Sequence, residues 1–209
     1  MSRRPVRTRR STSIVRNRSQ SGAARGATGR VLVLGGARSG KSAYAEELVG
    51  GGSPVDYFAT GTVPAARPTT IDEQHWRDRI EWHRRRRPSH WQTLEFASAR
   101  DVIPQLRSRP PGTACLVDDL GTWLTRVIDE TGGWSGLLDP SRASARQLIT
   151  TVAERRDVVL VSPEVGLGVI PSSRAGSIFR DELGILNAEI AAICDRVVLV
   201  VAGQPMTVK

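Results

Sequence analysis

A glycine-rich stretch between an apolar run and a helical pattern matches the phosphate-binding consensus GxxxxGK[ST]. Glycines let the backbone turn tightly and aim several N–H groups at one anion, at the positive end of a helix. Lys41 can then reach the β- and γ-phosphates of a nucleoside triphosphate, and the Ser42 hydroxyl can bind Mg²⁺. The flanking strand and helix patterns favour a P-loop over a chance turn. The nucleotide-binding residues predicted here are Gly35, Gly36, Ala37, Arg38, Ser39, Gly40, Lys41 and Ser42.

A carboxylate that could share this metal is expected at the end of another strand. The apolar run 114–117 ends in Asp118 and Asp119. Such a carboxylate commonly binds Mg²⁺ beside a P-loop or orients the nucleophile, and we predict that role for Asp118. Asp119 also fits a helix N-cap, and both interpretations stay open for it. These elements predict a nucleoside triphosphate site but do not identify the acceptor.

A histidine next to four arginines is the most unusual feature of the chain. His83 precedes Arg84, Arg85, Arg86 and Arg87, near the end of a helical pattern that Pro88 must stop. A neutral imidazole can attack phosphorus, and the neighbouring cations favour that neutral form. The arginines could hold phosphate oxygens. Composition alone favours a solvated basic helix end, and nucleic-acid binding is a third interpretation.

Short apolar runs alternate with amphipathic helical patterns from residue 30 onward. Continuous runs such as VLVL and VVLV are typical of strands covered on both faces, as in parallel sheets. The alternation predicts an α/β fold of the RecA-like P-loop NTPase type, with a mostly parallel sheet flanked by helices and a short antiparallel last strand. Predicted strands are 30–34, 55–59, 92–96, 114–118, 157–162, 196–201 and 206–208. Predicted helices are 41–49, 73–86, 99–107, 121–130, 141–155 and 177–194.

The net charge of +9 is concentrated in residues 1–29, which contain eight arginines and no acidic residue. The body is therefore nearly neutral, which argues against an extended nucleic-acid footprint. The Arg-, Ser- and Gly-rich composition predicts a disordered tail at 1–29 before a single domain at 30–209. A transit peptide, a flexible extension and an upstream start codon all fit this tail.

No run approaches the ~20 apolar residues that a membrane helix needs, so no membrane span is expected. Cys115 and Cys194 lie in or beside apolar segments, where buried free thiols are typical. We predict a cytoplasmic protein.

Six motifs in order resemble the adenosylcobinamide kinase/adenosylcobinamide-phosphate guanylyltransferase family over residues 30–209. They are GGARSGKS, ATG at 59–61, RIEWHRRRRPSHW at 79–91, LVDD at 116–119, PEVGLGVIP at 163–171 and FRDELGILN at 179–187. The resemblance implies phosphorylation of adenosylcobinamide by ATP or GTP. It then implies transfer of GMP from GTP through a GMP–histidine intermediate, with release of pyrophosphate.

The resemblance also implies residue roles. His83 matches the nucleophile, and Ser42 with Asp118 would bind Mg²⁺; some members carry Glu where Asp118 stands. A homo-oligomer, such as a trimer, is implied as well. Glu164 fits either a contact with substrate or a second subunit, or a cap or ion pair within its loop. Further implied nucleotide contacts are Ala59, Thr60, Gly61, Arg84, Arg85, Arg86, Arg87, Glu95 and Asp118.

Two alternative functions use the same motifs. A P-loop small-molecule kinase without guanylyl transfer would not depend on His83. A nucleic-acid-binding P-loop ATPase would use the arginine tail and would bind with a steep salt dependence.

Overall fold

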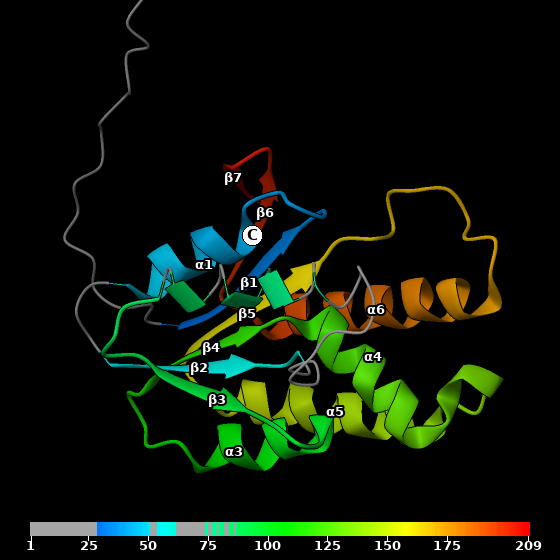
Figure 1. Cartoon of the computed structure of the whole chain (residues 1–209), viewed down its shortest axis with the longest axis horizontal. Helices are drawn as coiled ribbons and strands as arrows, with labels where there is room; N and C mark the ends of the chain where they lie inside the picture. The colour runs from blue at the N-terminus through cyan, green and yellow to red at the C-terminus, as the bar shows by residue number, and fades with distance from the viewer. Residues whose placement is uncertain are drawn as a thin grey trace, which may run out of the picture.

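A seven-stranded sheet forms the centre of the computed structural model, which describes residues 29–50, 54–61, 74, 77–78, 80–81, 84–85 and 87–209 (Figure 1). The strand order is β3-β2-β4-β5-β1-β6-β7. Every neighbouring pair is parallel except β6 and β7, which confirms the predicted fold class. The strands are β1 (Gly29–Gly35), β2 (Val55–Ala59), β3 (Gln92–Glu95), β4 (Ala114–Asp118), β5 (Asp157–Pro163), β6 (Arg196–Val201) and β7 (Gln204–Thr207).

Helices cover both faces of the sheet. Helix α1 packs on one face, and helices α3 to α6 pack on the other (Figure 1). Within the predicted helix 73–86, the described residues at 74, 77, 78, 80, 81, 84 and 85 are helical. The bounds are α1 (Lys41–Val49), α3 (Val102–Ser108), α4 (Leu120–Thr131), α5 (Asp139–Ala153) and α6 (Arg174–Ile193), with 3₁₀ turns η1 (Ala99–Asp101) and η2 (Gly133–Ser135).

The apolar runs read from the sequence supply both halves of the core. In β1, Val31 and Val33 belong to the cluster under α1, while Leu32 belongs to the cluster under the other helices. This alternation follows from the two-residue period of a strand, and both faces must be apolar because both are covered. Cys115 and Cys194 are buried and free, as predicted. Burial raises the pKa of the Cys115 thiol to about 11 and that of Cys194 to about 12, so both remain protonated.

Several element boundaries differ from the prediction, each for a local reason. Helix α6 begins at Arg174 rather than at 177, because the Ser173 side chain accepts a hydrogen bond from the Gly176 N–H. Helix α5 begins at Asp139, because Pro140 lies in its first turn, where a missing N–H costs nothing. Strand β1 starts at Gly29, one residue before the predicted domain boundary.

Two more predicted elements are wrong in detail. The helix predicted at 99–107 is a 3₁₀ turn followed by α3, because Ser98 and Asp101 form a capping box at its start. The last strand spans Gln204–Thr207 rather than 206–208. A tight turn causes the shift, since Ala202 and Gly203 both have positive φ and bring β7 back along β6.

Within the part of the chain that the structure describes, no helix combines the length and the apolar character needed to cross a membrane.

Candidate active site

The P-loop (residues 35–42) leaves the carboxyl end of β1, between the ends of β5 and β6. Gly35 has no room for a side chain, since a Cβ atom there would lie 2.4 Å from Ser39 Oγ and 2.7 Å from the Val200 carbonyl oxygen. The loop is closed by a 3.3 Å bond from the Ser39 N–H to the Gly36 carbonyl. It is tied to the β6–β7 turn by a 2.8 Å bond from the Gly203 N–H to the Ser39 carbonyl. Its conformation is therefore set largely by backbone contacts.

Lys41 is the first residue of α1, and its side chain turns back over the P-loop. Only 5% of Lys41 is exposed, and its Nζ donates to the Gly36 carbonyl oxygen at 3.3 Å. The N-cap is Gly40 in the left-handed region (φ 95°), and it has no side chain to bond the first N–H groups of the helix. These N–H groups and the Lys41 ammonium lie at the same end of α1, next to the P-loop. The arrangement suits the phosphates of a nucleotide.

Asp118, at the carboxyl end of β4, lies against this helix start. Its Oδ1 accepts a hydrogen bond from Ser42 Oγ at 3.1 Å, and its Oδ2 accepts one from Tyr57 Oη at 2.6 Å. The structure therefore brings together two residues that were predicted from separate motifs. Carboxylate and hydroxyl oxygens are the ligands that Mg²⁺ prefers, so this pair fits that ion. The pKa of Tyr57 is raised well above its ordinary value by burial and by the Asp118 charge, so its hydroxyl stays a donor.

Asp119 has a structural role beside it. Its carboxylate caps α4, since Oδ1 accepts from the Thr122 N–H at 2.7 Å. This geometry supports the N-cap interpretation of Asp119. The peptide bond between Asp118 and Asp119 is cis.

The end of β2 and the turn after it contain the predicted residues Ala59, Thr60 and Gly61. Thr60 is fully buried, and its hydroxyl donates to the Asp119 carbonyl oxygen at 2.8 Å. Its own carbonyl accepts a 2.9 Å bond from Arg126 on α4. Arg126 also donates to two carbonyls that follow β3, Phe96 and Ala97, each at 2.9 Å. Arg126 thus fixes the ends of two strands at the site, a role that sequence reasoning missed.

The arginine run splits into side chains with different partners. Arg84 forms an ion pair with Glu95 at the end of β3, whereas Arg85 pairs with Glu81 on the exposed helix surface at 3.0 Å. The Arg87 guanidinium lies 3.4 Å above the centre of the Tyr57 ring and donates to Thr93 Oγ1 at 3.2 Å. Two arginines therefore turn toward β2 and β3. His83 and Arg86 lie outside the described residues.

The β5–α6 loop (residues 164–173) leaves the same edge of the sheet as a wide arc (Figure 1). Its first residue is bonded to the P-loop strand, since the Glu164 N–H donates to the Gly35 carbonyl at 3.1 Å. The Glu164 carboxylate accepts from the Gly166 N–H at 2.7 Å, so it stabilises its own loop. Farther along, Leu167, Val169 and Ile170 are 85%, 92% and 77% exposed. These three apolar side chains lie on the loop that follows β5, the strand next to β1.

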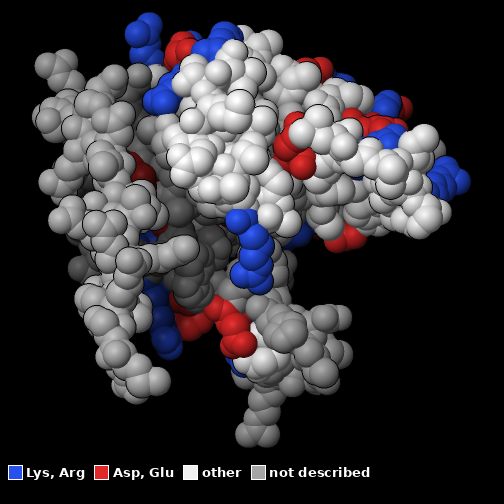
Figure 2. All heavy atoms as spheres, turned by 90° about the horizontal axis from the view of Figure 1, so that it is seen from above, with Lys and Arg blue, Asp and Glu red and all other residues white. Residues whose placement is uncertain are grey.

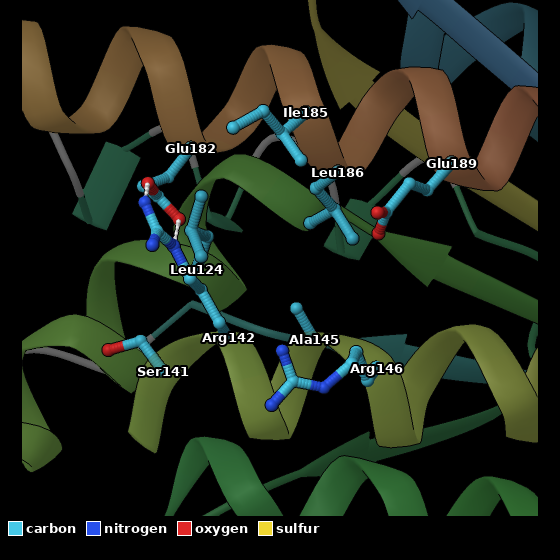
Figure 3. Close-up of a pocket in the computed structure, with 9 residues that line it drawn as sticks. All are labelled: Leu124, Ser141, Arg142, Ala145, Arg146, Glu182, Ile185, Leu186 and Glu189. Carbon is cyan, nitrogen blue, oxygen red and sulfur yellow. Dashed lines mark hydrogen bonds and ion pairs between the residues drawn. The ribbon is translucent and has the colours of Figure 1, made fainter. Parts of the chain in front are cut away.

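The described surface shows no extended basic patch in the view of Figure 2, where acidic and basic side chains are interspersed. A hollow between α4, α5 and α6 lies on the sheet face opposite α1 (Figure 3). Arg142 and Glu182 form a two-bond ion pair at one end of it, at 3.0 and 2.6 Å. Its apolar floor includes Leu124 and Leu186. We assign this hollow to helix packing rather than to chemistry.

Comparison with known proteins adds the acceptor that the geometry alone cannot identify. The family model described as "Cobinamide kinase / cobinamide phosphate guanyltransferase" matches residues 31–208. The chain belongs to this family.

Curated members of the cobinamide kinase family resemble the chain over most of its length. The bifunctional adenosylcobalamin biosynthesis protein CobP of Pseudomonas aeruginosa is 40% identical, covering 86% of this chain and 97% of its own. The bifunctional adenosylcobalamin biosynthesis protein CobU of Escherichia coli is 35% identical, covering 86% and 99%. Among solved structures, the P4 protein of bacteriophage phi6 in complex with ADP matches with a TM-score of 0.36 at 15% identity. That match covers 85% of this chain and 52% of that one.

Proposed function

We propose that this protein phosphorylates the hydroxyl group of adenosylcobinamide and then converts the product to adenosylcobinamide-GDP. The first step takes a phosphoryl group from ATP or GTP, and the second takes GMP from GTP and releases pyrophosphate. The observation that carries the proposal is the 3.1 Å contact between Ser42 and Asp118, at the P-loop of a chain whose family model spans residues 31–208.

In the kinase step the protein positions phosphates rather than forming bonds with them. The N–H groups at the start of α1 and the Lys41 ammonium hold the β- and γ-phosphoryl oxygens. Ser42 and Asp118 are the ligands that would hold Mg²⁺, which when bound neutralises charge on these phosphates. The substrate hydroxyl attacks the γ-phosphorus, and the nucleoside diphosphate leaves.

In the guanylyl step His83 acts as nucleophile. Its imidazole attacks the α-phosphorus of GTP, a P–N bond forms, and the bond to pyrophosphate breaks. An oxygen of the substrate phosphate then attacks the same phosphorus and displaces the imidazole. Two contacts support this role for a residue outside the described part. Arg84 pairs with Glu95 and Arg87 lies over Tyr57, so two arginines that follow His83 contact β3 and β2, and β2 pairs with β4, the strand that ends in Asp118.

The proposal also includes further residues that contact the nucleotide: Ala59, Thr60, Gly61, Arg85 and Arg86. We also propose that the protein is cytoplasmic and forms a homo-oligomer, such as a trimer. The exposed apolar side chains of Leu167, Val169 and Ile170 support an assembly, because a monomer rarely leaves a group of such residues in water.

Labelling with α-³²P-GTP and Mg²⁺ tests the proposal. Wild-type protein and His90→Ala should acquire an acid-labile, base-stable label, whereas His83→Ala should acquire none. His90 is a matched control because it belongs to the same segment and its side chain is exposed. In parallel, γ-³²P-GTP should label cobinamide in all three proteins.

The other outcomes identify the alternatives. Transfer of γ-phosphate without any α-label on the wild type would indicate a small-molecule kinase only. A nucleic-acid-binding ATPase would show neither the γ-phosphate transfer nor the α-label. It would instead bind nucleic acid in a salt-dependent way, and this binding would be lost when residues 1–29 are removed.

A further inference from the structure

Tyr57 is a buried side chain that connects the Mg²⁺ ligand with the arginine segment, and no motif predicted it. It lies on β2, is 2% exposed, and has Thr93 of β3 as its register partner. Its hydroxyl reaches Asp118 on the neighbouring strand β4 at 2.6 Å. Its ring carries the Arg87 guanidinium on one face and stacks with Trp91, with 6.5 Å between ring centres.

Each oxygen of the Asp118 carboxylate accepts a hydrogen bond from a different residue. Oδ2 accepts from Tyr57, and Oδ1 accepts from Ser42 on the P-loop side. A carboxylate that can rotate would spend part of its time turned away from Ser42. A buried phenol that holds one oxygen fixes the direction of the other, as partners of metal-binding carboxylates commonly do.

We propose that Tyr57 is a positioning residue. Its hydroxyl orients the Asp118 carboxylate toward Ser42, and Arg87, stacked on its ring, holds Tyr57 in that position. Through this contact the segment that follows His83 is linked to the metal-binding oxygen. The inference rests on the proposed role of Asp118, but not on guanylyl transfer.

Arg87 is suited to this role because its side chain is itself held. Its Nη1 donates to Thr93 Oγ1 at 3.2 Å. The backbone N–H of Arg87 donates to the Arg84 carbonyl oxygen at 3.2 Å. Arg84 in turn pairs with Glu95, two residues farther along β3. A cation over an aromatic face is attracted by the ring quadrupole, and more strongly where water is partly excluded.

The test is the Mg²⁺ dependence of binding of a fluorescent, slowly hydrolysed GTP analogue, which needs no acceptor substrate. Tyr57→Phe keeps the ring and removes only the hydroxyl. It should raise the Mg²⁺ concentration for half-maximal binding about tenfold or more, as expected for loss of a hydrogen bond to a charged group. The matched control is Tyr44→Phe, which removes a hydroxyl from the same side of the sheet, where it bonds to Arg196. It should leave that concentration unchanged.

A double-mutant cycle separates positioning from a general structural effect. If Tyr57 acts through Asp118, Tyr57→Phe should add almost nothing to Asp118→Asn, whereas an independent effect would add in full. Should Tyr57→Phe unfold, Arg87→Gln keeps the hydroxyl and should shift the Mg²⁺ dependence about twofold to fivefold in the same direction.

An unchanged Mg²⁺ dependence in a folded Tyr57→Phe, or full additivity with Asp118→Asn, would overturn the proposal. Its failure is distinct from failure of the proposed function. A wild type that binds the nucleotide with Mg²⁺ but never labels His83 would refute guanylyl transfer and leave the Tyr57 result standing.

Discussion

Two glycine-rich loops leave neighbouring strands at the same edge of the sheet, but one is held by contacts within the fold and the other exposes apolar side chains to solvent. The P-loop follows β1 and the β5–α6 loop follows β5, and the two strands end in register with Gly35 opposite Pro163. In the P-loop, backbone bonds and the buried Lys41 fix the chain. In the other loop, Leu167 and Val169 point their side chains into solvent.

Glycine serves different purposes in the two loops. At Gly35 a side chain would collide with Ser39 and with the β6 backbone, and Gly40 needs its positive φ. At Gly168 nothing lies within 4 Å of a Cβ position, and φ is not in the left-handed region. The fold therefore requires Gly35 and Gly40 of the P-loop. Gly168 and the exposed Leu167, Val169 and Ile170 of the β5–α6 loop are not required by the described fold, which directs attention to molecules outside the chain.

Removing the Lys41 ammonium should have the largest effect. In Lys41→Met the side chain keeps its length but loses the charge that faces the phosphates. Phosphoryl transfer should fall about 10²–10³-fold, the range for loss of one preorganised donor to a transferring group. The rate of γ-³²P transfer measures this. Leu167→Ser in the other loop is the control and should transfer the γ-phosphoryl group at about the wild-type rate. Equal losses in both variants would contradict the comparison.

The paired substitutions Gly35→Ala and Gly168→Ala test the two glycines directly. The methyl group at 35 must displace Ser39 or the β6 backbone, which should lower the free energy of unfolding by about 1–3 kcal/mol and weaken GTP binding. At 168 the same change meets open space and reduces the freedom of the unfolded chain, so stability should be unchanged or rise by about 0.4–1 kcal/mol. Urea denaturation of the two variants gives both values. A neutral Gly35→Ala would refute the close contact.

The sequence predicted the parts of the molecule that obey a local rule. The P-loop, Val55–Ala59 and Ala114–Asp118 were predicted at their observed bounds, because continuous apolar runs and a glycine motif each impose one backbone arrangement. The contact between Ser42 and Asp118 followed, since parallel strands bring their carboxyl ends to one edge.

The parts that were missed depend on partners distant in sequence. Tyr57 reads as an ordinary residue of an apolar strand, and Thr60 was predicted only as a nucleotide contact. Nothing in that segment points to Asp118 or Asp119. Arg126 offered a faint signal, as a single cation inside the apolar pattern LTRVI, but its three carbonyl partners come from turns after β2 and β3. Start signals for α6 and α5 are nevertheless present in the sequence, at Ser173 and Pro140.

The apolar side chains of the β5–α6 loop should contribute little to the stability of an isolated chain. Replacing Leu167, Val169 and Ile170 by Ser, one at a time, should change the free energy of unfolding by no more than about 0.5 kcal/mol each. Val161→Ala, in the buried part of β5, is the positive control and should cost about 1.5–3 kcal/mol. Denaturation at several protein concentrations checks this. If the Ser variants lose stability, and the loss grows with protein concentration, then an assembly buries these side chains.

A small effect is also expected at the opposite edge of the sheet, at the amino ends of β1 and β6. Arg30, at the start of β1, donates three hydrogen bonds to the Asp195 carboxylate. Its side chain donates through Nη2 at 2.9 Å and Nε at 3.2 Å, and its backbone N–H donates at 2.8 Å. The side-chain and backbone hydrogen bonds from Arg30 lower the pKa of Asp195 from 3.8 to about 2. The contribution to stability is therefore present above pH 4 and is lost as the pH falls from 4 toward 2.

Half of the Asp195 side chain is exposed, so solvent screening limits this contribution to roughly 0.2–1 kcal/mol. Asp195→Asn should lower stability at pH 7 by that amount and should flatten the decline between pH 4 and 2, as measured by urea denaturation across this range. GTP binding at pH 7 should not change, because Arg30 and Asp195 lie at the amino ends of strands whose carboxyl ends form the site. A selective loss of GTP binding would mean that the P-loop depends on strain transmitted along β1. The conformation of the P-loop would then not be set by its local backbone contacts. The contrast with the exposed β5–α6 loop would no longer hold.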